Sequence, residues 1–429
     1  MVELRTRTTP RVPKACSNCG RQFGCAEGAP GCWCESIVLS GETLAELRSF
    51  ADDCLCPTCL GEFAERDRRE SGAGRAGWAK AIPDVAIRAR GVPPAWGLGA
   101  LVFLVAALAF ALGVGPISIG PWPIVEAALS HVPLLDIHSH LSAVDRAILW
   151  QLRAPRVVLA ALVGGMLAVS GSAYQGVFRN PLADPYLLGV AAGAGLGATL
   201  AIAYASAASS GELLPVAAFA GAIVGVAGAY VLGRSVGGVR NTGTLILAGV
   251  TVAAFMTAVQ TFVQQKRSET LREVYSWLLG GFGAATWHDV LLVTPYIAVS
   301  SVVILLHRRV LDVLSLGDEE AASLGLDVRR VRLVIVVAAT AGTAAAVAVS
   351  GLIGFVGIIV PHTVRLLVST SYRAVVPLSL LGGAAFLVLA DVIARTVMSP
   401  SELPIGVVTA FFGAPFFAVV LRTTRRLGS

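Results

Sequence analysis

Cysteine is absent from the last 370 residues of this 429-residue chain, and charged residues are scarce throughout it. All eight cysteines lie between Cys16 and Cys59. Asp, Glu, Lys and Arg make up 14% of the chain, against roughly 25% in an ordinary globular domain. With 55% hydrophobic residues and a mean hydropathy of +0.74, the composition excludes an ordinary soluble domain and predicts a chain that crosses a membrane several times.

Other missing features narrow the function classes. The chain has no GxxxxGK[ST] sequence, so it cannot bind ATP through the phosphate-binding loop that this motif forms. The apolar segments hold few ionisable residues, which argues against a proton- or sodium-coupled carrier. The net charge of +6 is spread over loops, whereas nucleic-acid binding needs a clustered basic surface. A membrane pore without an energy site of its own implies an external source of energy.

One stretch, Arg153–Gly195, organises the membrane part. From Pro155 to Val177 its only charge is Arg156, and a helix over these residues would be about 34 Å long, enough to cross a hydrocarbon core of about 30 Å. Small residues recur at every fourth position, namely Ala160, Gly164, Ala168, Ser172 and Gly176. This spacing puts them on one helix face and predicts close packing against neighbouring helices.

Ten membrane spans are predicted from the apolar runs. They cover residues 96–114, 155–177, 185–205, 214–232, 244–263, 290–306, 333–350, 353–369, 377–397 and 404–421. Arginines concentrate in alternate connections, which places both termini in the cytosol by the positive-inside rule. The predicted fold is an all-α polytopic membrane protein with a small cysteine-rich N-terminal cytosolic module. Its expected parts are that module over residues 1–62, a basic linker over 63–93 and a membrane domain over 94–429.

The cysteines of the N-terminal module predict a metal site. Two CxxC pairs, Cys16/Cys19 and Cys56/Cys59, can each present two thiolates to one tetrahedral ion. Eight thiolates could fill two such sites: Cys16, Cys19, Cys25, Cys32, Cys34, Cys54, Cys56 and Cys59. A segment this short needs a metal or disulfides to hold its fold, and the cytosol favours the metal. We expect zinc in a structural site, with iron–sulfur binding, metal sensing or redox chemistry as alternatives.

Two further patterns allow a functional or a structural interpretation. The segment HVPLLDIHSH contains His131, His138 and His140 beside an aspartate, which could bind a metal, but its spacing fits no known site and an ordinary loop is favoured. Gly193 and Gly195 imitate a dinucleotide-binding fingerprint, yet no strand precedes them and no acidic residue follows at the required distance. For these glycines a helix-packing face is the better interpretation.

Charges within and between the spans are the remaining candidates. Asp391 and Arg395 are four residues apart and therefore share a helix face. They form either a structural ion pair or a docking site at the outer end of the ninth span. The connection LDVLSLGDEEAASLGLDVRRVR after the sixth span is predicted to contain short helical pieces. It is either a solvated turn or a docking element for a cytosolic partner.

Several motifs together resemble a known family. They are RAPR, GGMLAVSGSAYQGVFRNPLADPYLLG, LAGVTV, LDVLSLGDEEAASLGLDV, GLIGFVGIIVPHTVR, LADVIAR and ELPIGVVTAFFGAPFF, in this order. The resemblance covers nearly all of residues 96–425 and is to the permease subunits of ABC importers for ferric chelates, haem and cobalamin. It implies a homodimer in the bacterial inner membrane, two cytosolic ATPase subunits and a periplasmic substrate-binding protein. The permease itself would not be an enzyme.

The resemblance also implies roles for particular residues. Arg153, Arg156 and Arg395 match the basic positions that receive the binding protein. The segment that enters the ATPase matches about 314–326, with Leu314, Gly317, Asp318, Glu319, Ala321, Leu324 and Gly325. The N-terminal cysteines resemble the bacterial cysteine-rich CWC family, which typical permeases of this kind lack.

The cargo stays open between classes of chelate. The segment WLLGGFGAATW looks more like cobalamin permeases, whereas siderophore permeases are the commoner class, and haem is a third candidate. A different hypothesis makes the chain a membrane-anchored metal or redox sensor whose cysteine-rich module is the functional part. Neighbouring genes for an ATPase and a binding protein would favour transport.

Overall fold

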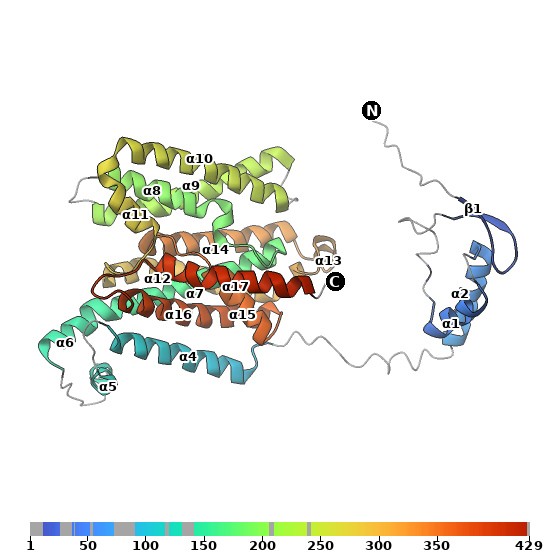
Figure 1. Ribbon diagram of the computed structural model, residues 1–429, viewed down its shortest axis with the longest axis horizontal. Helices are drawn as coiled ribbons and strands as arrows, with labels where there is room; N and C mark the ends of the chain where they lie inside the picture. Colours follow the sequence, from blue (N-terminus) through green and yellow to red (C-terminus); the bar gives the residue numbers. More distant parts are fainter. Residues whose placement is uncertain are drawn as a thin grey trace. The chain divides into compact units, whose positions relative to one another are not determined.

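The computed structural model describes residues 12–25, 37, 39–51, 55–72, 91–115, 120–130, 141–205, 210–237 and 242–426. The chain divides into two compact units, residues 1–88 and 89–429 (Figure 1). The predicted linker lies mostly outside the described residues, as do the three histidines of the HVPLLDIHSH segment.

The first unit is a β-hairpin followed by two helices. Strands β1 (Val12–Ala15) and β2 (Gln22–Cys25) pair antiparallel. Helix α1 (Gly41–Phe50) begins at Ser40, whose hydroxyl accepts a hydrogen bond from the Thr43 backbone N–H, as an N-cap does. Helix α2 (Pro57–Gly72) continues past residue 62, and its Asp67 accepts hydrogen bonds from Ser40 at 2.6 and 2.7 Å. The core of this unit is small and includes Cys16, Cys56 and Cys59.

The second unit is a bundle of apolar helices. Each predicted span has its helix: α4 (Pro94–Gly113), α7 (Ala154–Phe178), α8 (Val190–Tyr204), α9 (Ser210–Gly237), α10 (Thr242–Lys266), α12 (Trp287–Leu314), α14 (Val328–Ser350), α15 (Val356–Leu367), α16 (Tyr372–Thr396) and α17 (Ile405–Arg426). Among the described residues, seven helices are long and apolar enough to cross a membrane, and three shorter apolar ones complete the set. The predicted fold class is confirmed.

Short elements connect the long helices. They are α5 (Pro121–Leu129), α6 (Ala143–Ala147), η2 (Ile148–Arg153), η3 (Pro185–Leu188), η4 (Ser268–Thr270), α11 (Leu271–Leu278) and α13 (Asp318–Ser323). Two of them, η4 and α11, make the connection after α10 partly helical.

Helix α7 lies at the centre of the bundle, with α12, α14, α15 and α16 against it (Figure 1). All but three of its residues are buried. A Cβ on Gly164 would collide with the backbone carbonyl of Gly383 in α16, and one on Gly171 would collide with Gly357 at the start of α15. The small-residue stripe therefore brings helix backbones together, as predicted.

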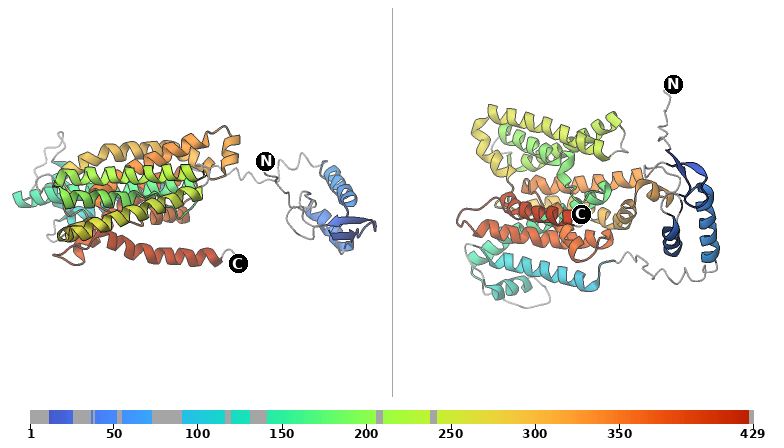
Figure 2. Two further views of the ribbon diagram at one scale, coloured as in Figure 1. Left: turned by 90° about the horizontal axis from the view of Figure 1, so that it is seen from above. Right: turned by 45° about the vertical axis from the view of Figure 1, so that its right-hand side comes forward.

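Helices α8, α9 and α10 form a separate layer beside α14 (Figures 1 and 2). A Cβ on Gly193 of α8 would collide with Gly221 of α9, and one on Gly197 would collide with Ala217. These glycines are in a helix–helix contact, which confirms the packing interpretation over the nucleotide one.

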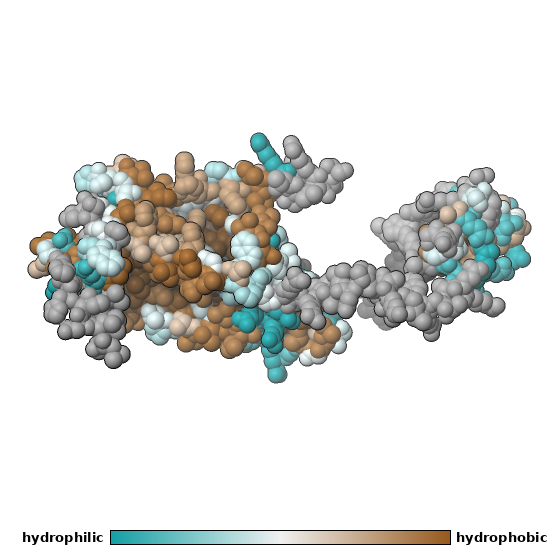
Figure 3. Space-filling view, turned by 90° about the horizontal axis from the view of Figure 1, so that it is seen from below, coloured by the Kyte–Doolittle hydropathy of each residue, from teal (hydrophilic) through white to brown (hydrophobic). Residues whose placement is uncertain are grey.

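The outer surface of the bundle is apolar. Figure 3 shows brown, hydrophobic side chains over most of the visible face of the bundle, with hydrophilic residues towards its ends. On α12, for example, Leu291 and Leu306 are more than 70% exposed. A soluble protein seldom exposes so large an apolar area, whereas lipid chains cover it at no cost.

Candidate functional site

A cluster of charges lies where α7 begins and α16 ends. We call Arg153, Arg156, Asp391, Arg395 and Glu402 the arginine cluster. Arg156 Nε donates to both carboxylate oxygens of Asp391 at 3.0 and 3.1 Å, and Nη2 donates to Oδ1 at 2.9 Å. Its Nη1 and Nη2 donate to the two oxygens of Glu402 at 2.7 and 3.0 Å. One guanidinium thus joins α7, α16 and the α16–α17 connection. Its planar geometry favours such paired hydrogen bonds to carboxylates.

The other two arginines of the cluster bind the end of α4. Arg395 Nη2 donates to the carbonyl of Ala111 at 2.5 Å, and Arg153 Nη1 donates to the carbonyls of Leu112 and Gly113 at 2.9 and 3.2 Å. The last carbonyls of a helix lack partners within it and carry partial negative charge. Cationic side chains there satisfy the carbonyls and hold the C-terminal end of α4 against α7 and α16.

The structure therefore brings the three predicted docking arginines together but buries them. Arg153, Arg156 and Arg395 are 5%, 9% and 4% exposed. Asp391 and Arg395 do share a face, with Nε 3.6 Å from Oδ2. Their role towards a binding protein stays a prediction. Sequence reasoning missed Glu402, whose side chain is 44% exposed; the only signal was an acidic residue directly before LPIG.

The predicted coupling segment lies beyond the opposite end of α7. Leu314 and Ala321 are buried and anchor it, while Leu316 and Leu324 are each 65% exposed. Gly317 and Gly325 have φ values of +144° and +82°, which a residue without Cβ adopts readily. Asp318 accepts a hydrogen bond from Arg332 Nη2 of α14 at 2.8 Å and lies 3.4 Å from Arg179 Nη2, just after α7. Short α13 is thus tied to two long helices.

A second ion-pair network at this end was not predicted. Asp312, near the end of α12, accepts hydrogen bonds from the Ser371 hydroxyl at 2.8 Å and the Tyr372 backbone N–H at 2.6 Å. The same carboxylate lies 3.5 Å from Arg373 Nε. It fixes the start of α16 on α12, close to the coupling segment.

A polar cavity of about 490 Å³ lies beside α10. Thr257, Gln260 and Gln264 of α10 line it together with Tyr186 and Tyr275. Both glutamines are less than 9% exposed. Neutral amides and hydroxyls in the interior of a membrane bundle are costly unless they have a use, so this cavity is a candidate for contact with cargo.

The first unit holds a cluster of four thiols. The Sγ atoms of Cys16, Cys19, Cys56 and Cys59 all lie within 4.8 Å of one another, and those of Cys19 and Cys56 are 3.7 Å apart. Tetrahedral zinc with bonds of about 2.3 Å spaces its sulfur ligands about 3.8 Å apart. The hairpin and the start of α2 thus bring the two CxxC pairs together at a spacing that fits one such ion.

The backbone around these thiols favours a thiolate. Burial opposes ionisation of Cys16, but hydrogen bonds from the backbone N–H groups of Cys56, Cys19 and Asn18 lower its pKa to about 6. Contact with the Cys19 thiol, together with burial, raises the pKa of Cys59 to about 12. Of the other predicted ligands, Cys32, Cys34 and Cys54 lie outside the described residues, and the Cys25 side chain does too.

Each of the two units matches the model of a known family. The model of the FecCD transport family matches residues 103–423, and that of the cysteine-rich CWC family matches residues 16–61. The cobalamin import system permease protein of Halobacterium salinarum is 38% identical over 358 residues, covering 76% of this chain and 96% of the relative. The Fe(3+)-citrate import system permease protein of Bacillus subtilis is 36% identical over 334 residues, with the same coverage of both chains.

A solved structure also resembles the membrane unit. A protein assigned to the metal-chelate type of ABC transporter, in an inward-facing conformation, covers 77% of this chain and 100% of its own. The TM-score is 0.67 at 30% sequence identity. Because the family model spans most of the chain and two relatives match along nearly their whole length, this chain belongs to the FecCD transport family.

Proposed function

We propose that this chain is the membrane permease of an importer for a metal chelate: a cobalamin, a ferric chelate or haem. The membership in the FecCD transport family carries this proposal, and the names of the two relatives agree with it. Cytosolic ATPase subunits would supply the energy, because the chain has no phosphate-binding loop of its own. The membrane would be the inner, or plasma, membrane, with both termini in the cytosol.

The arginine cluster is proposed to receive the substrate-binding protein. Arg156 shares its guanidinium between Asp391, which is buried, and Glu402, which is half-exposed. A carboxylate of the docked protein can replace Glu402 on Arg156, while Asp391 keeps the arginine in place. An acidic partner would also be steered towards this end by charge.

The segment around α13 is proposed to contact the ATPase. Exposed Leu316 and Leu324 flank α13 and offer apolar anchors for a cleft on that subunit. Asp318 ties α13 to α14 through Arg332 and to the end of α7 through Arg179. Movement of α13 on ATP-driven closure would therefore reach the long helices as rigid-body motion.

Two copies of the chain are proposed to form the pore. Large aromatic side chains point outward on α10 and α17: Phe255, Phe262 and Phe411 are 70%, 67% and 74% exposed. Aromatic faces of this kind are typical of the buried centre of an interface. The polar cavity also lies beside α10, so a dimer along this helix would put its amides and hydroxyls next to the shared pathway.

Uptake by the reconstituted importer tests this function. The permease, its ATPase and its binding protein would be placed in proteoliposomes and assayed with radiolabelled cobalamin, ferric siderophore and haem. We expect ATP-dependent accumulation of one class only. The variant Arg156→Glu should abolish uptake, whereas Arg272→Glu, at an exposed position of α11, should not. Equal uptake by both variants would overturn the docking role, and accumulation of none of the three chelates would overturn the transport proposal.

The N-terminal unit is proposed to hold one zinc ion on Cys16, Cys19, Cys56 and Cys59. The compact spacing of the four sulfurs supports a single ion, since an iron–sulfur cluster would hold its thiolates further apart. Elemental analysis of the full chain should give about one zinc per chain. The double variant Cys16→Ser/Cys56→Ser should lose it, and Thr58→Ala, beside the site, should keep it. Iron with visible absorbance would replace zinc in this proposal, and uptake without residues 1–72 would show whether transport needs the unit.

A further inference from the structure

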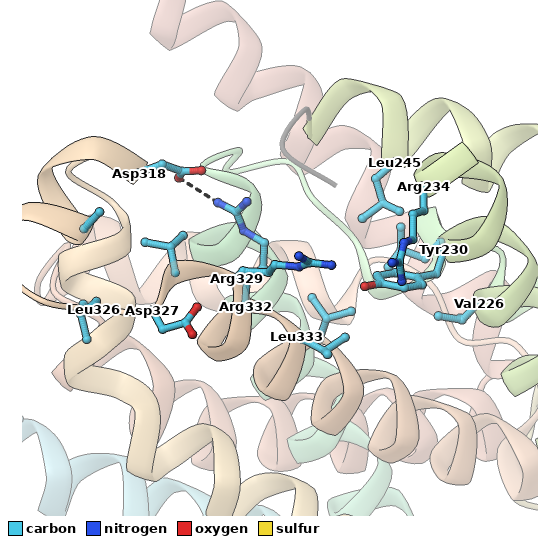
Figure 4. A pocket seen from close by; sticks show the side chains of 14 residues that line it. Val226, Tyr230, Arg234, Leu245, Asp318, Leu326, Asp327, Arg329, Arg332 and Leu333 are labelled. Carbon is cyan, nitrogen blue, oxygen red and sulfur yellow. Dashed lines mark hydrogen bonds and ion pairs between the residues drawn. The ribbon is translucent and has the colours of Figure 1, made fainter. Parts of the chain in front are cut away.

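A second cavity, of about 700 Å³, lies between α9, α10, α13 and α14 (Figure 4). Its inner wall is apolar and is formed by Leu188, Val226, Leu245 and Val336. Three arginines stand around it: Arg234 from α9, and Arg329 and Arg332 from the first turns of α14. In Figure 4, Arg329 extends from α14 towards the side of the cavity where Tyr230 and Arg234 lie, whereas Arg332 reaches towards Asp318. The cavity is amphipathic, with an apolar wall and cationic groups.

Two acids, Asp318 and Asp327, also line this cavity, and of its three arginines they pair only with Arg332 among the described residues. Asp327 pairs with Arg330 at 2.9 Å, and Asp318 is shared between Arg332 and Arg179. Among the described residues, Arg234 and Arg329 form no ion pair within 4.0 Å. Arg234 and Arg329 are therefore two cationic groups of this cavity that no carboxylate of the described residues pairs with.

Arg332 adds a buried donor. Its residue is 8% exposed, and its Nη2 donates to Asp318. Its Nε is buried without a hydrogen-bond partner in the described structure. A buried N–H of a charged group is costly to leave unsatisfied, and an anionic oxygen in the cavity would satisfy it.

We propose that this cavity binds the headgroup of an anionic phospholipid such as phosphatidylglycerol. The phosphate would lie among Arg234, Arg329 and Arg332, and the glycerol and upper acyl chains would lie along the leucine and valine wall. Arg329 and Arg332 stand in the first turns of α14 and Arg234 stands in the last turn of α9. Both helices are apolar enough to span the membrane, so the three arginines lie at the depth where headgroups are found. Basic pockets between membrane helices at such a boundary bind acidic lipids.

The lipid site has a consequence for coupling, which rests on the proposed role of α13. Arg332 is the residue through which Asp318 ties α13 to α14. A phosphate that engages Arg332 Nε would fix this guanidinium while it still holds Asp318. Acidic lipid would thereby hold α13 in place for the ATPase.

Lipid binding can be measured without transport. The purified chain would be delipidated and placed in nanodiscs of phosphatidylcholine with a small fraction of phosphatidylglycerol, and the bound lipid counted by native mass spectrometry. The variants are Arg234→Gln and Arg329→Gln, both at exposed positions. Each should weaken phosphatidylglycerol binding about fivefold, since one basic residue near the surface contributes about 1 kcal/mol. The matched control is Arg330→Gln, whose side chain is 87% exposed and pairs with Asp327; it should bind as the unmodified chain does.

Three outcomes would overturn the proposal. The first is equal retention of phosphatidylcholine and phosphatidylglycerol. The second is a loss of binding in the Arg330→Gln control equal to that in the other two variants. The third is displacement of the lipid by millimolar inorganic phosphate, which would identify a site for soluble anions. The coupling consequence has its own test, in which phosphatidylglycerol should raise uptake by the unmodified chain but not by Arg234→Gln or Arg329→Gln. The binding measurement does not depend on transport, so the two tests can fail separately.

Discussion

The two ends of α7 are built in different ways. At its beginning, Arg156 makes five hydrogen bonds to two carboxylates, and Asp391 is 1% exposed. At its far end, Arg179 approaches Asp318 at 3.4 Å, with side chains 42% and 35% exposed. Buried pairs are costly to break from one side, whereas exposed pairs contribute little. The first end is a fixed anchor and the second can adjust, which suits the docking role proposed for the first end and the coupling role proposed for the second.

The largest expected effect comes from breaking the anchor. The variant Asp391→Ala leaves Arg156 and Arg395 buried without their shared carboxylate, and we expect a loss of about 3–5 kcal/mol of stability. Thermal unfolding of the detergent-solubilised chain would measure it. Arg272→Ala, at an exposed site, should change stability by about 0.5 kcal/mol or less. Equal melting of the two variants would show that the cluster is not an anchor.

A second variant changes the middle of α7, where the helix packs against α16. Gly164→Ala puts a methyl group against the carbonyl of Gly383, and we expect a cost of about 1–3 kcal/mol. The matched control is Gly99→Ala on α4, where a Cβ meets nothing within 4 Å; it should be neutral or stabilise the helix by about 0.5–1 kcal/mol. The same thermal assay separates the two, and a neutral Gly164→Ala would contradict the close contact of α7 with α16.

The variant Glu402→Gln separates the contributions of the two carboxylates that bind Arg156. It removes the exposed partner of Arg156 and leaves the buried one, so stability should fall by only about 1 kcal/mol. Because the carboxylate competes with the docked protein in our proposal, binding of the substrate-binding protein should tighten. Surface-plasmon resonance on nanodisc-embedded permease would measure this affinity. A weaker complex would mean that Glu402 is part of the docking surface rather than a competitor for Arg156.

The smallest effect on stability is expected at the adjustable end. Asp318→Asn should cost about 1 kcal/mol or less, because the new amide oxygen can still accept a hydrogen bond from the buried Arg332. Added salt should reduce the part of this difference that comes from the exposed pair with Arg179. The effect on function should be larger than the effect on folding, since α13 loses its ionic ties to α14 and α7. ATP hydrolysis by the assembled importer, compared with its uptake, would report this uncoupling. A large melting shift would show that the two ends are alike after all.

Hydropathy predicted the ten apolar helices that match the expected spans, because each has an apolar run that only a membrane or a protein core can accommodate. The stripe on α7 and the glycines of α8 were also predictable, since their fourfold spacing has one structural use in a membrane. The arginine cluster was harder. The sequence shows that Asp391 and Arg395 share a face, but Arg156 reaches the same carboxylate across 235 positions. That contact depends on how α7 packs on α16, which no local pattern encodes.

The same limit applies to the other sites. Two CxxC pairs predicted a metal site, but their spacing did not show which of eight cysteines share one ion. The segment around α13 was found from its glycines and acids, whereas the cavity with Arg234 and Arg332 unites residues from distant helices. Pairings of this kind follow from tertiary contacts rather than from periodicity.

The contact of Gly164 with Gly383 constrains how the bundle can change shape. With no side chain between the two backbones, α7 and α16 have no room to slide or roll past each other and must travel as one body. The α8–α10 layer meets α14, beside that body, through apolar side chains such as Ala344, Val347 and Ala348. On the proposed transport function, we expect alternating access to displace that layer against the block formed by α7 and α16. Spin-label distances should change between α9 and α16 during the ATP cycle while those between α7 and α16 stay constant.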